Sequence, residues 1–161
     1  MLKKEILDPC CGSRMFWFDK NNPSVVFGDI RNETHTLCDG RKLSISPDQY
    51  IDFTAIPYPD SSFKLIVLDP PHLDKLGKTS WMGLKYGVLG ADWKEQLTKA
   101  FNECMRVLEP SGVLIFKWNE AQIRLVDVLP LFKIQPLFGH TSGRHGKTIW
   151  LCFMKTDLIN Q

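Results

Sequence analysis

The segment LIVLDPPHL, residues 65–73, joins an apolar run to an acid, two prolines and a histidine. If the run is a strand, its tip carries the carboxylate of Asp69 and the carbonyl of Pro70, and both accept hydrogen bonds from a substrate NH₂ group. Such bonds would orient the nitrogen lone pair for an in-line displacement, so the chemistry would be mostly positioning. The carboxylate would also stabilise positive charge on the nitrogen. Pro71 would stiffen the turn, and a metal site or a plain turn are the alternatives.

Two more acids, Asp8 and Asp29, also follow apolar runs. In an open α/β sheet, ligands bind beyond the carboxyl ends of the strands, where the topology reverses. The turn DPCCGS contains Gly12, which allows close backbone approach, and Asp29 stands where a carboxylate binds two ribose hydroxyls. The separation of about 21 residues between the acids is typical of one strand, turn, helix and strand unit of a nucleotide site. An adenosine-containing cofactor explains these features, whereas each acid taken singly could only cap a turn.

Short apolar runs that alternate with helical patterns predict an α/β fold with a layered sheet. We expect a Rossmann-like, doubly wound, mostly parallel seven-stranded sheet with a C-terminal antiparallel hairpin. The parallel strands are expected at residues 5–9, 24–30, 49–52, 63–71 and 112–120, and the hairpin strands at residues 130–139 and 147–155.

Apolar residues at spacings of three and four predict a helix over residues 92–108, where Asp92 and Glu95 resemble a capping box. A second helix is expected over residues 120–129, with Asn119 as its N-cap and Pro130 at its end. Between residues 29 and 50, two alternating runs around Asp39-Gly40 predict a hairpin in place of a helix.

Residues 71–90 are too long for an ordinary connection and are typical of a lid or binding loop. Aromatic and cationic residues alternate in this loop, as they do on surfaces that bind flipped bases or single strands. They are Trp81, Tyr86, Lys75, Lys78 and Lys85. The alternative is a solvated loop whose Trp81 covers the core. A second basic loop, with His140, Arg144, His145 and Lys147, either contacts phosphate or is only solvated.

The composition describes one globular domain, residues 1–161, since the chain is 43% hydrophobic and long enough for a single core. We expect a cytoplasmic protein, because the sequence shows neither a membrane span nor an export signal. Five cysteines, an odd number, favour reduced thiols. The net charge of +2 does not by itself indicate a nucleic-acid partner.

Four segments stand in the order found in a known group of enzymes: ILDPCCGSRMF, VVFGDIR, IDFTAIPYPDSSFKLIVLDPPH and EPSGVLIFKWNE. Together they resemble the class I S-adenosylmethionine-dependent methyltransferases. Within that class they resemble the amino-methyltransferases marked by Asp-Pro-Pro and an aromatic residue. The whole chain is similar to compact single-domain methyltransferases carried by bacteriophages and prophages.

The resemblance implies a cofactor, S-adenosyl-L-methionine, with S-adenosyl-L-homocysteine as its product. Its methionine end would lie against the first turn, formed by Asp8, Pro9, Cys10 and Gly12. Asp29 would bind the ribose, and Ile30, Asp52 and Phe53 would contact the adenine. The catalytic residues would be Asp69, Pro70, Pro71 and His72.

His72 stands where the family usually has Tyr, Phe or Trp to stack on a flipped base. An imidazole can stack, donate a hydrogen bond, accept a proton or be purely structural. The expected substrate-binding residues are Trp81, Tyr86, Lys78, Trp118 and Asn119, although Trp118 could instead pack in the core.

The function expected from these features is methyl transfer to an exocyclic amino nitrogen, with adenine N6 in DNA as the acceptor. Alternatives are an enzyme for RNA, a protein side chain or a small molecule, and a catalytically silent scaffold that binds cofactor or nucleic acid. We expect DNA rather than RNA as a partner, no membrane, and a homodimer or accessory protein for specificity, since so short a chain leaves little to read base edges.

Two other uses of the cysteines are disfavoured. A zinc site from Cys10, Cys11, Cys38 and His35 lacks any C-x-x-C pair, so we expect no metal. A cytosine carbon-5 enzyme would need a Pro-Cys nucleophile where this chain has Pro71-His72.

Overall fold

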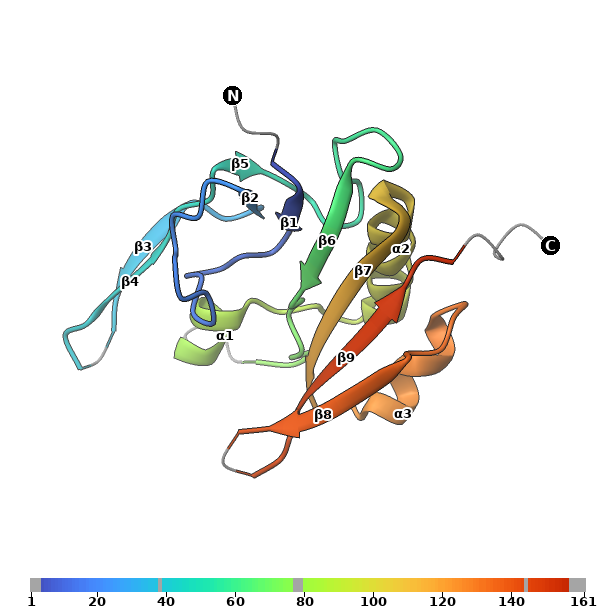
Figure 1. The fold of residues 1–161 in the computed structure, drawn as a ribbon. Coiled ribbons are helices and arrows are strands. Elements are labelled where there is room, and N and C mark those ends of the chain that lie inside the picture. The colour runs from blue at the N-terminus through green and yellow to red at the C-terminus, as the bar shows by residue number, and fades with distance from the viewer. Residues whose placement is uncertain (1–3, 38, 77–79, 144, 157–161) are drawn as a thin grey trace.

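The computed structural model describes residues 4–37, 39–76, 80–143 and 145–156, except for the side chain of Trp81 (Figure 1). Its main sheet has seven strands in the order β5-β2-β1-β6-β7-β9-β8. The strands are β1 (Ile6–Asp8), β2 (Val25–Asp29), β5 (Gln49–Tyr50), β6 (Phe63–Leu68), β7 (Leu108–Asn119), β8 (Phe138–Ser142) and β9 (Thr148–Met154). The first five of the order are parallel, and β9 is antiparallel to both its neighbours. The predicted sheet and terminal hairpin are confirmed.

The strand order reverses at β1, which pairs with β2 on one side and with β6 on the other. Ile6 is in register with both Val25 and Leu65, so the three parallel strands end at nearly the same level. Ligands bind at such a reversal, beyond the carboxyl ends of the strands. Asp8 and Asp29 end β1 and β2, and Asp69 follows β6, so the three predicted acids meet there.

The predicted helix between Asp8 and Asp29 is wrong, because residues 9–24 form turns and irregular chain. Proline, glycine and the Asn-Asn-Pro sequence in this segment disfavour a helix, and no apolar stripe of helical period spans the segment. Trp17 packs instead on Phe27, with 5.2 Å between the ring centroids. The segment thus covers its face of the sheet with side chains of a loop.

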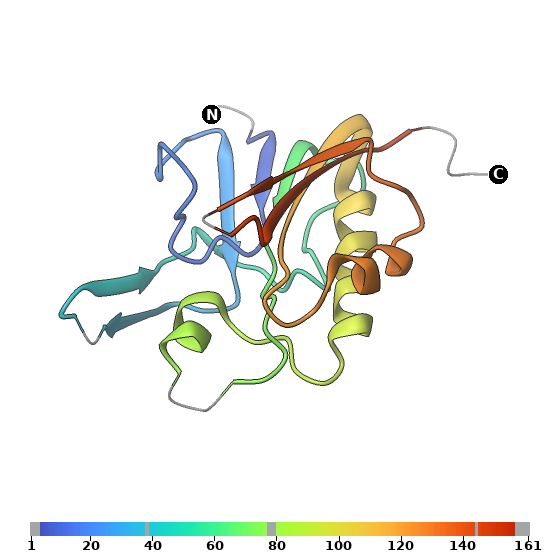
Figure 2. The same cartoon turned by 90° about the horizontal axis from the view of Figure 1, so that it is seen from below.

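Between β2 and β5, the predicted hairpin is confirmed as β3 (Glu33–Thr36) and β4 (Lys42–Ile45). It projects from the body of the molecule in both ribbon views (Figures 1 and 2). Gly40 adopts a φ of 81° at its tip, a left-handed conformation that glycine adopts without strain.

The opposite face of the sheet carries the helices, α2 (Trp93–Val107) and α3 (Leu125–Val128), the latter continued by a 3₁₀ turn, Leu129–Leu131 (Figure 2). Phe101 of α2 stacks on Phe132 at 4.1 Å between ring centroids, and Phe132 packs edge-on against Phe116 of β7. Alternation along β2 shows the two faces, since Val26 belongs to this larger core whereas Val25 and Phe27 face the loop of residues 9–24.

Several predicted boundaries need correction. The helix at residues 92–108 is confirmed, but Asp92 makes no capping bond and accepts one from the Gln96 side chain. The helix expected at residues 120–129 begins only at Leu125, because Asn119 closes a local turn by accepting from Ala121 N. The strand expected at residues 130–139 begins at Phe138, after Pro130 and Pro136.

The long loop of residues 71–90 contains a short helix, α1 (Trp81–Tyr86), which ends at Gly87. Gly87 has a φ of 76°, and a Cβ there would lie 3.1 Å from the ring of Pro71, so a side chain would be strained and crowded. Among the described residues, no helix is long and apolar enough to cross a membrane.

Candidate active site

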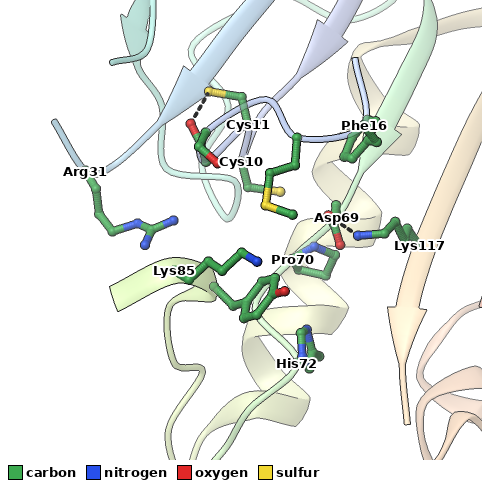
Figure 3. A pocket seen from close by; sticks show the side chains of 13 residues that line it. Cys10, Cys11, Phe16, Arg31, Asp69, Pro70, His72, Lys85 and Lys117 are labelled. Atoms are coloured by element: carbon green, nitrogen blue, oxygen red, sulfur yellow. Dashed lines mark hydrogen bonds and ion pairs between the residues drawn. The ribbon is translucent and has the colours of Figure 1, made fainter. Parts of the chain in front are cut away.

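One pocket opens where β1, β2 and β6 end (Figure 3). The turn after β1, the segment after β6, helix α1 and strand β7 all contribute to its wall. The lining residues are Cys10, Cys11, Gly12, Ser13, Met15, Phe16, Arg31, Asp69, Pro70, His72, Lys85, Tyr86 and Lys117. Of the predicted residues, this pocket therefore unites Cys10 and Gly12 of the first turn with Asp69, Pro70, His72 and Tyr86.

Asp29 lies at the tip of β2 with its carboxylate only 3% exposed. Its Oδ2 accepts a hydrogen bond from the backbone N–H of Gly12 at 2.9 Å, which ties the first turn to the end of β2. Gly12 has a φ of 50°, so glycine suits this position. The structure thus brings together two residues that the sequence separates, and it leaves no Cβ between the turn and the pocket.

Arg31 also binds Asp29, and sequence reasoning missed this residue. Its backbone N–H and Nε donate to Oδ1 at 2.9 and 3.2 Å, and Nη2 donates to Oδ2 at 3.4 Å. Nη1 donates to the carbonyl oxygen of Leu84 in α1 at 3.0 Å. Arg31 therefore links the tip of β2 to the loop of residues 71–90. The sequence signal was a cation two residues after the acid, a spacing that places it on the same face.

Asp8 is fully buried and does not line the pocket, and neither does Pro9. The Oδ2 atom of Asp8 accepts a hydrogen bond from the indole N–H of Trp17 at 2.8 Å, and its Oδ1 atom accepts one from the backbone N–H of Cys10 at 3.3 Å. Burial raises the pKa of Asp8 to about 7, and Trp17 only partly opposes this effect. The nearby Asp69 and Asp29 carboxylates raise it further. Asp8 therefore changes its charge near neutral pH.

Asp69 projects into the pocket beside Pro70, and Lys117 of β7 reaches it from the side (Figure 3). The Lys117 ammonium donates to Oδ2 of Asp69 at 2.5 Å. Burial raises the pKa of Asp69, and the charge and hydrogen bond of Lys117 oppose that shift. Pro71 does not line the pocket and packs against Gly87. Sequence reasoning missed Lys117, although strand alternation places it on the face opposite Trp118.

His72 is 8% exposed, with its ring centroid 5.2 Å from that of Tyr86 and 6.5 Å from that of Trp118. Burial lowers the pKa of His72 to about 4, and the positive charge of Lys117 adds to this effect. The imidazole is therefore neutral at physiological pH. It lines the pocket as a flat, uncharged ring, packed against Tyr86.

The remaining expected substrate residues lie elsewhere. Trp118 is fully buried, stacks on Phe116 and donates its indole N–H to Ile123 O at 2.9 Å, so it belongs to the core. Asn119 donates to Thr148 Oγ1 at 3.0 Å and joins β7 to β9. Neither lines the pocket. Trp81 belongs to α1, but its side chain and the whole of Lys78 lie outside the described residues.

Ile30, Asp52 and Phe53 line a separate groove, together with Thr54, Asp92, Glu95, Gln96 and Lys99. Ile30 is 52% exposed, whereas Phe53 is nearly buried. Asp52 Oδ1 accepts from the backbone and hydroxyl of Thr54 at 2.8 and 2.7 Å. An exposed apolar side chain, an aromatic ring and a carboxylate in one groove fit a flat heterocycle with an amino edge.

The described cysteines, Cys10, Cys11, Cys104 and Cys152, are free thiols, and Cys38 lies outside the described part of the chain. Within that part, no three His, Cys, Asp or Glu side chains are grouped so as to hold a metal ion. In the loop between β8 and β9, Lys147 and His145 are exposed, and Arg144 is not described.

The fold is similar to solved structures whose sequences are very different. An S-adenosylmethionine-dependent methyltransferase from Methanosarcina mazei matches with a TM-score of 0.56 at 11% identity, over 97% of this chain and 94% of that one. TrmN from Thermus thermophilus matches with a TM-score of 0.59 at 16% identity, over 96% of this chain and 44% of that one. A Listeria monocytogenes protein assigned to the class I S-adenosylmethionine-dependent methyltransferases matches with a TM-score of 0.53 at 14% identity, over 100% and 57% of the two chains.

No protein-family model matches the sequence, and no curated protein is significantly similar to it. The structural matches show the fold, which is that of class I S-adenosylmethionine-dependent methyltransferases.

Proposed function

We propose that this protein is an S-adenosylmethionine-dependent methyltransferase that acts on an exocyclic amino nitrogen, with adenine N6 in DNA as its acceptor. The observation that carries the proposal is the shared pocket, in which the first turn, Cys10–Ser13, faces Asp69 and Pro70. A cofactor against the turn and an amino group against the strand tip would meet within one cavity. Such a meeting provides the proximity that a direct transfer needs.

The residues present fit the cofactor. Asp29 would bind the ribose hydroxyls, the turn containing Gly12 would receive the methionine end, and the groove of Ile30, Asp52 and Phe53 would hold the adenine. When bound, S-adenosylmethionine supplies an electrophilic methyl group on its sulfonium. Because Arg31 already donates to both oxygens of Asp29, its guanidinium would give way to the two hydroxyls.

On the acceptor side, two oxygens are available to an amino group. Asp69 Oδ1 and the carbonyl oxygen of Pro70 accept no hydrogen bond from any residue that the structure describes. An NH₂ group that donates to both would direct its lone pair away from the strand tip. The neutral ring of His72, packed on Tyr86, would supply an aromatic wall for a planar substrate.

A nucleic-acid substrate is supported by the charge of the pocket wall. Lys85 lines it together with Arg31 and Lys117, which pair with Asp29 and Asp69, and cations in the pocket wall would attract phosphate. Phe16 and Tyr86 offer aromatic surfaces on which a flipped base can stack. A second copy or an accessory protein would supply sequence readout, since the short chain leaves little surface for it.

The first test is calorimetric titration with S-adenosylhomocysteine. We expect binding that weakens about 100-fold in Asp29→Ala, because the charged acceptor for the ribose is lost. Asp39→Ala is the matched control, since Asp39 likewise binds the arginine two residues later, Arg41, but lies exposed on the β3–β4 hairpin. NAD serves as the control ligand. Binding that is absent, or unaffected by Asp29→Ala, would reject the cofactor assignment.

Acceptors are then compared by transfer of a labelled methyl group to unmethylated DNA, to RNA and to small amines. Transfer to DNA supports the full proposal. Transfer to RNA or small amines alone would support the methyltransferase activity and reject DNA as the acceptor. Cofactor binding without any transfer would indicate a scaffold.

Arg31→Ala provides a separate prediction about the cofactor site. Because the guanidinium competes with the ribose for Asp29, its removal should tighten binding of S-adenosylhomocysteine by about fivefold, or ~1 kcal/mol. Parallel calorimetry of wild-type protein, Arg31→Ala and the exposed control Arg41→Ala measures the change. Weaker binding in Arg31→Ala would show that Arg31 holds the cofactor and does not compete with it.

A further inference from the structure

We propose that Lys117 is a positioning residue of the acceptor site: its ammonium holds one oxygen of Asp69 and leaves the other, with the Pro70 carbonyl, to bind the amino group. This inference rests on the proposed function, because it assigns the residue to the acceptor side of that reaction. It adds a group from β7, a strand that supplied no confirmed pocket residue from the sequence.

The sheet register places Lys117 beside Asp69. Leu68 at the end of β6 pairs with Phe116, so the next residue on each strand, Asp69 and Lys117, stand side by side on the opposite face. Phe116 points into the core, which leaves Lys117 facing the pocket. The two charged side chains are 22% and 21% exposed, so their contact is substantially shielded from water.

Two aromatic rings hold the ammonium in place. Lys117 Nζ lies 5.4 Å from the ring centroid of Phe16 and 5.6 Å from that of Trp150. Cations over aromatic faces are attracted by the ring quadrupole. Phe16 comes from the turn after β1 and Trp150 from β9, so two separate elements confine a side chain that would otherwise be flexible. This confinement directs the ammonium to Oδ2 of Asp69.

The charges around Asp69 explain why the ammonium matters. Asp8 from β1 lies near Asp69 and adds like charge when ionised, as does the Cys10 thiol when deprotonated. His72, two residues after Pro70, is neutral and therefore offsets none of the negative charge around Asp69. Arg31 is bound to Asp29, and Lys85 belongs to the far wall on α1. Among the cations that the structure describes, Lys117 is thus the one in direct contact with Asp69.

Without this cation, burial would favour the protonated carboxyl of Asp69. A protonated carboxyl presents a donor where the substrate NH₂ also presents a donor, so the amino group would lose its alignment. Without the contact to the ammonium, the Asp69 side chain would also be free to rotate away from the pocket. Lys117 therefore acts on the acceptor through Asp69.

The test uses Lys117→Met, which keeps the chain length but removes the charge, and Lys117→Arg, which restores the charge. Carbon-13 NMR follows the Asp69 carboxyl through a pH titration, with the signal assigned by its loss in Asp69→Asn. We expect the Asp69 pKa to rise in Lys117→Met and to return toward the wild-type value in Lys117→Arg. Lys64→Met is the control, since Lys64 of β6 also pairs with an acid, Glu5, at 2.7 Å but is exposed.

Transfer rates on the same proteins provide the second readout. The kcat/KM of Lys117→Met should fall about 100-fold near neutral pH, as expected for a misplaced acceptor group, and recover as the pH rises. Affinity for S-adenosylhomocysteine and the thermal midpoint should match those of Lys64→Met, which verifies folding.

The two readouts separate the two proposals. An Asp69 pKa that does not move in Lys117→Met, or an unchanged pH profile of transfer, overturns the role of Lys117. A moved pKa with no transfer by wild-type protein to any amino acceptor would reject the proposed function, and the acceptor-site role would fall with it.

Discussion

Replacing Asp69 by Asn is expected to lower methyl transfer by about 1000-fold, because it removes the charged acceptor that orients the amino group. The amide has a single acceptor oxygen, and Lys117 would claim it, since the ammonium already donates to Oδ2 of Asp69 at 2.5 Å. The NH₂ half of the amide would then meet the substrate amino group donor to donor. Affinity for S-adenosylhomocysteine should change by less than about threefold, because the residues assigned to the cofactor lie on other elements.

Initial rates with a labelled methyl donor, measured beside calorimetry on the same preparations, test this result. Asp69→Ala should behave alike, which guards against an effect peculiar to the amide. Asp60→Asn is the matched control, because Asp60 also binds a cation, Arg106 at 2.9 Å, but is 77% exposed and remote from the pocket. Turnover in Asp69→Asn equal to that of Asp60→Asn would reject the mechanism.

Replacing Asp8 by Asn is expected to remove a contribution of about 4 kcal/mol that protonation of Asp8 makes to folding stability at low pH. Burial raises the pKa of Asp8 to about 7 in the folded protein, against an ordinary value of 3.8. The folded state therefore binds this proton more readily than the unfolded chain does. The stabilisation is complete below pH 3.8 and is lost as the pH rises through about 7.

His72 has the opposite effect in almost the same range. Its pKa falls from 6.5 to about 4 on folding, chiefly through burial, so the unfolded chain binds the proton more readily. The corresponding stability is present above pH 6.5 and is lost as the pH falls through about 4. In the wild-type protein the two slopes oppose each other, so each is seen in full only when the other residue is replaced.

Urea unfolding at steps between about pH 4.5 and 8.5 measures these slopes. Stability of Asp8→Asn should fall with acidification, whereas stability of His72→Asn should rise, and Asp60→Asn should follow the wild type. If the stability of Asp8→Asn and of wild-type protein changed equally with pH, Asp8 would be ionised throughout this range. The contribution of Asp8 to the pH dependence of stability would then be rejected.

The neighbouring acids at adjacent strand tips contribute to the raised pKa of Asp8. The folded protein neutralises Asp29 with Arg31 and Asp69 with Lys117, whereas Asp8 accepts, from the described residues, only the N–H groups of Trp17 and Cys10. Buried like charges without a cation shift toward the neutral form. The unpaired burial of Asp8 therefore lowers folding stability near neutral pH, where its carboxyl begins to ionise.

The sequence by itself determined the strands and the acids that end them. The three central strands β1, β2 and β6 are each marked locally, by a run of apolar residues that stops at Asp8, Asp29 or Asp69, and local patterns are read directly from the chain. The helix of residues 93–107 and the hairpin at Gly40 were predictable for the same reason. Because parallel strands place their carboxyl ends at one edge of the sheet, the sequence also predicted that these acids lie at one site.

Only the tertiary structure decided which cations meet those acids and which expected residues face the pocket. Lys117 reaches Asp69 through the β6–β7 register, and Arg31 joins Asp29 to Leu84, contacts between residues about 50 positions apart. Trp118 packs in the core because Lys117, the preceding residue on β7, faces the pocket on the other side of the sheet. Residues 9–24 are irregular, and Trp17 in this segment packs on Phe27 without a helix. Pairings over such separations depend on how whole elements pack, and no local pattern encodes them.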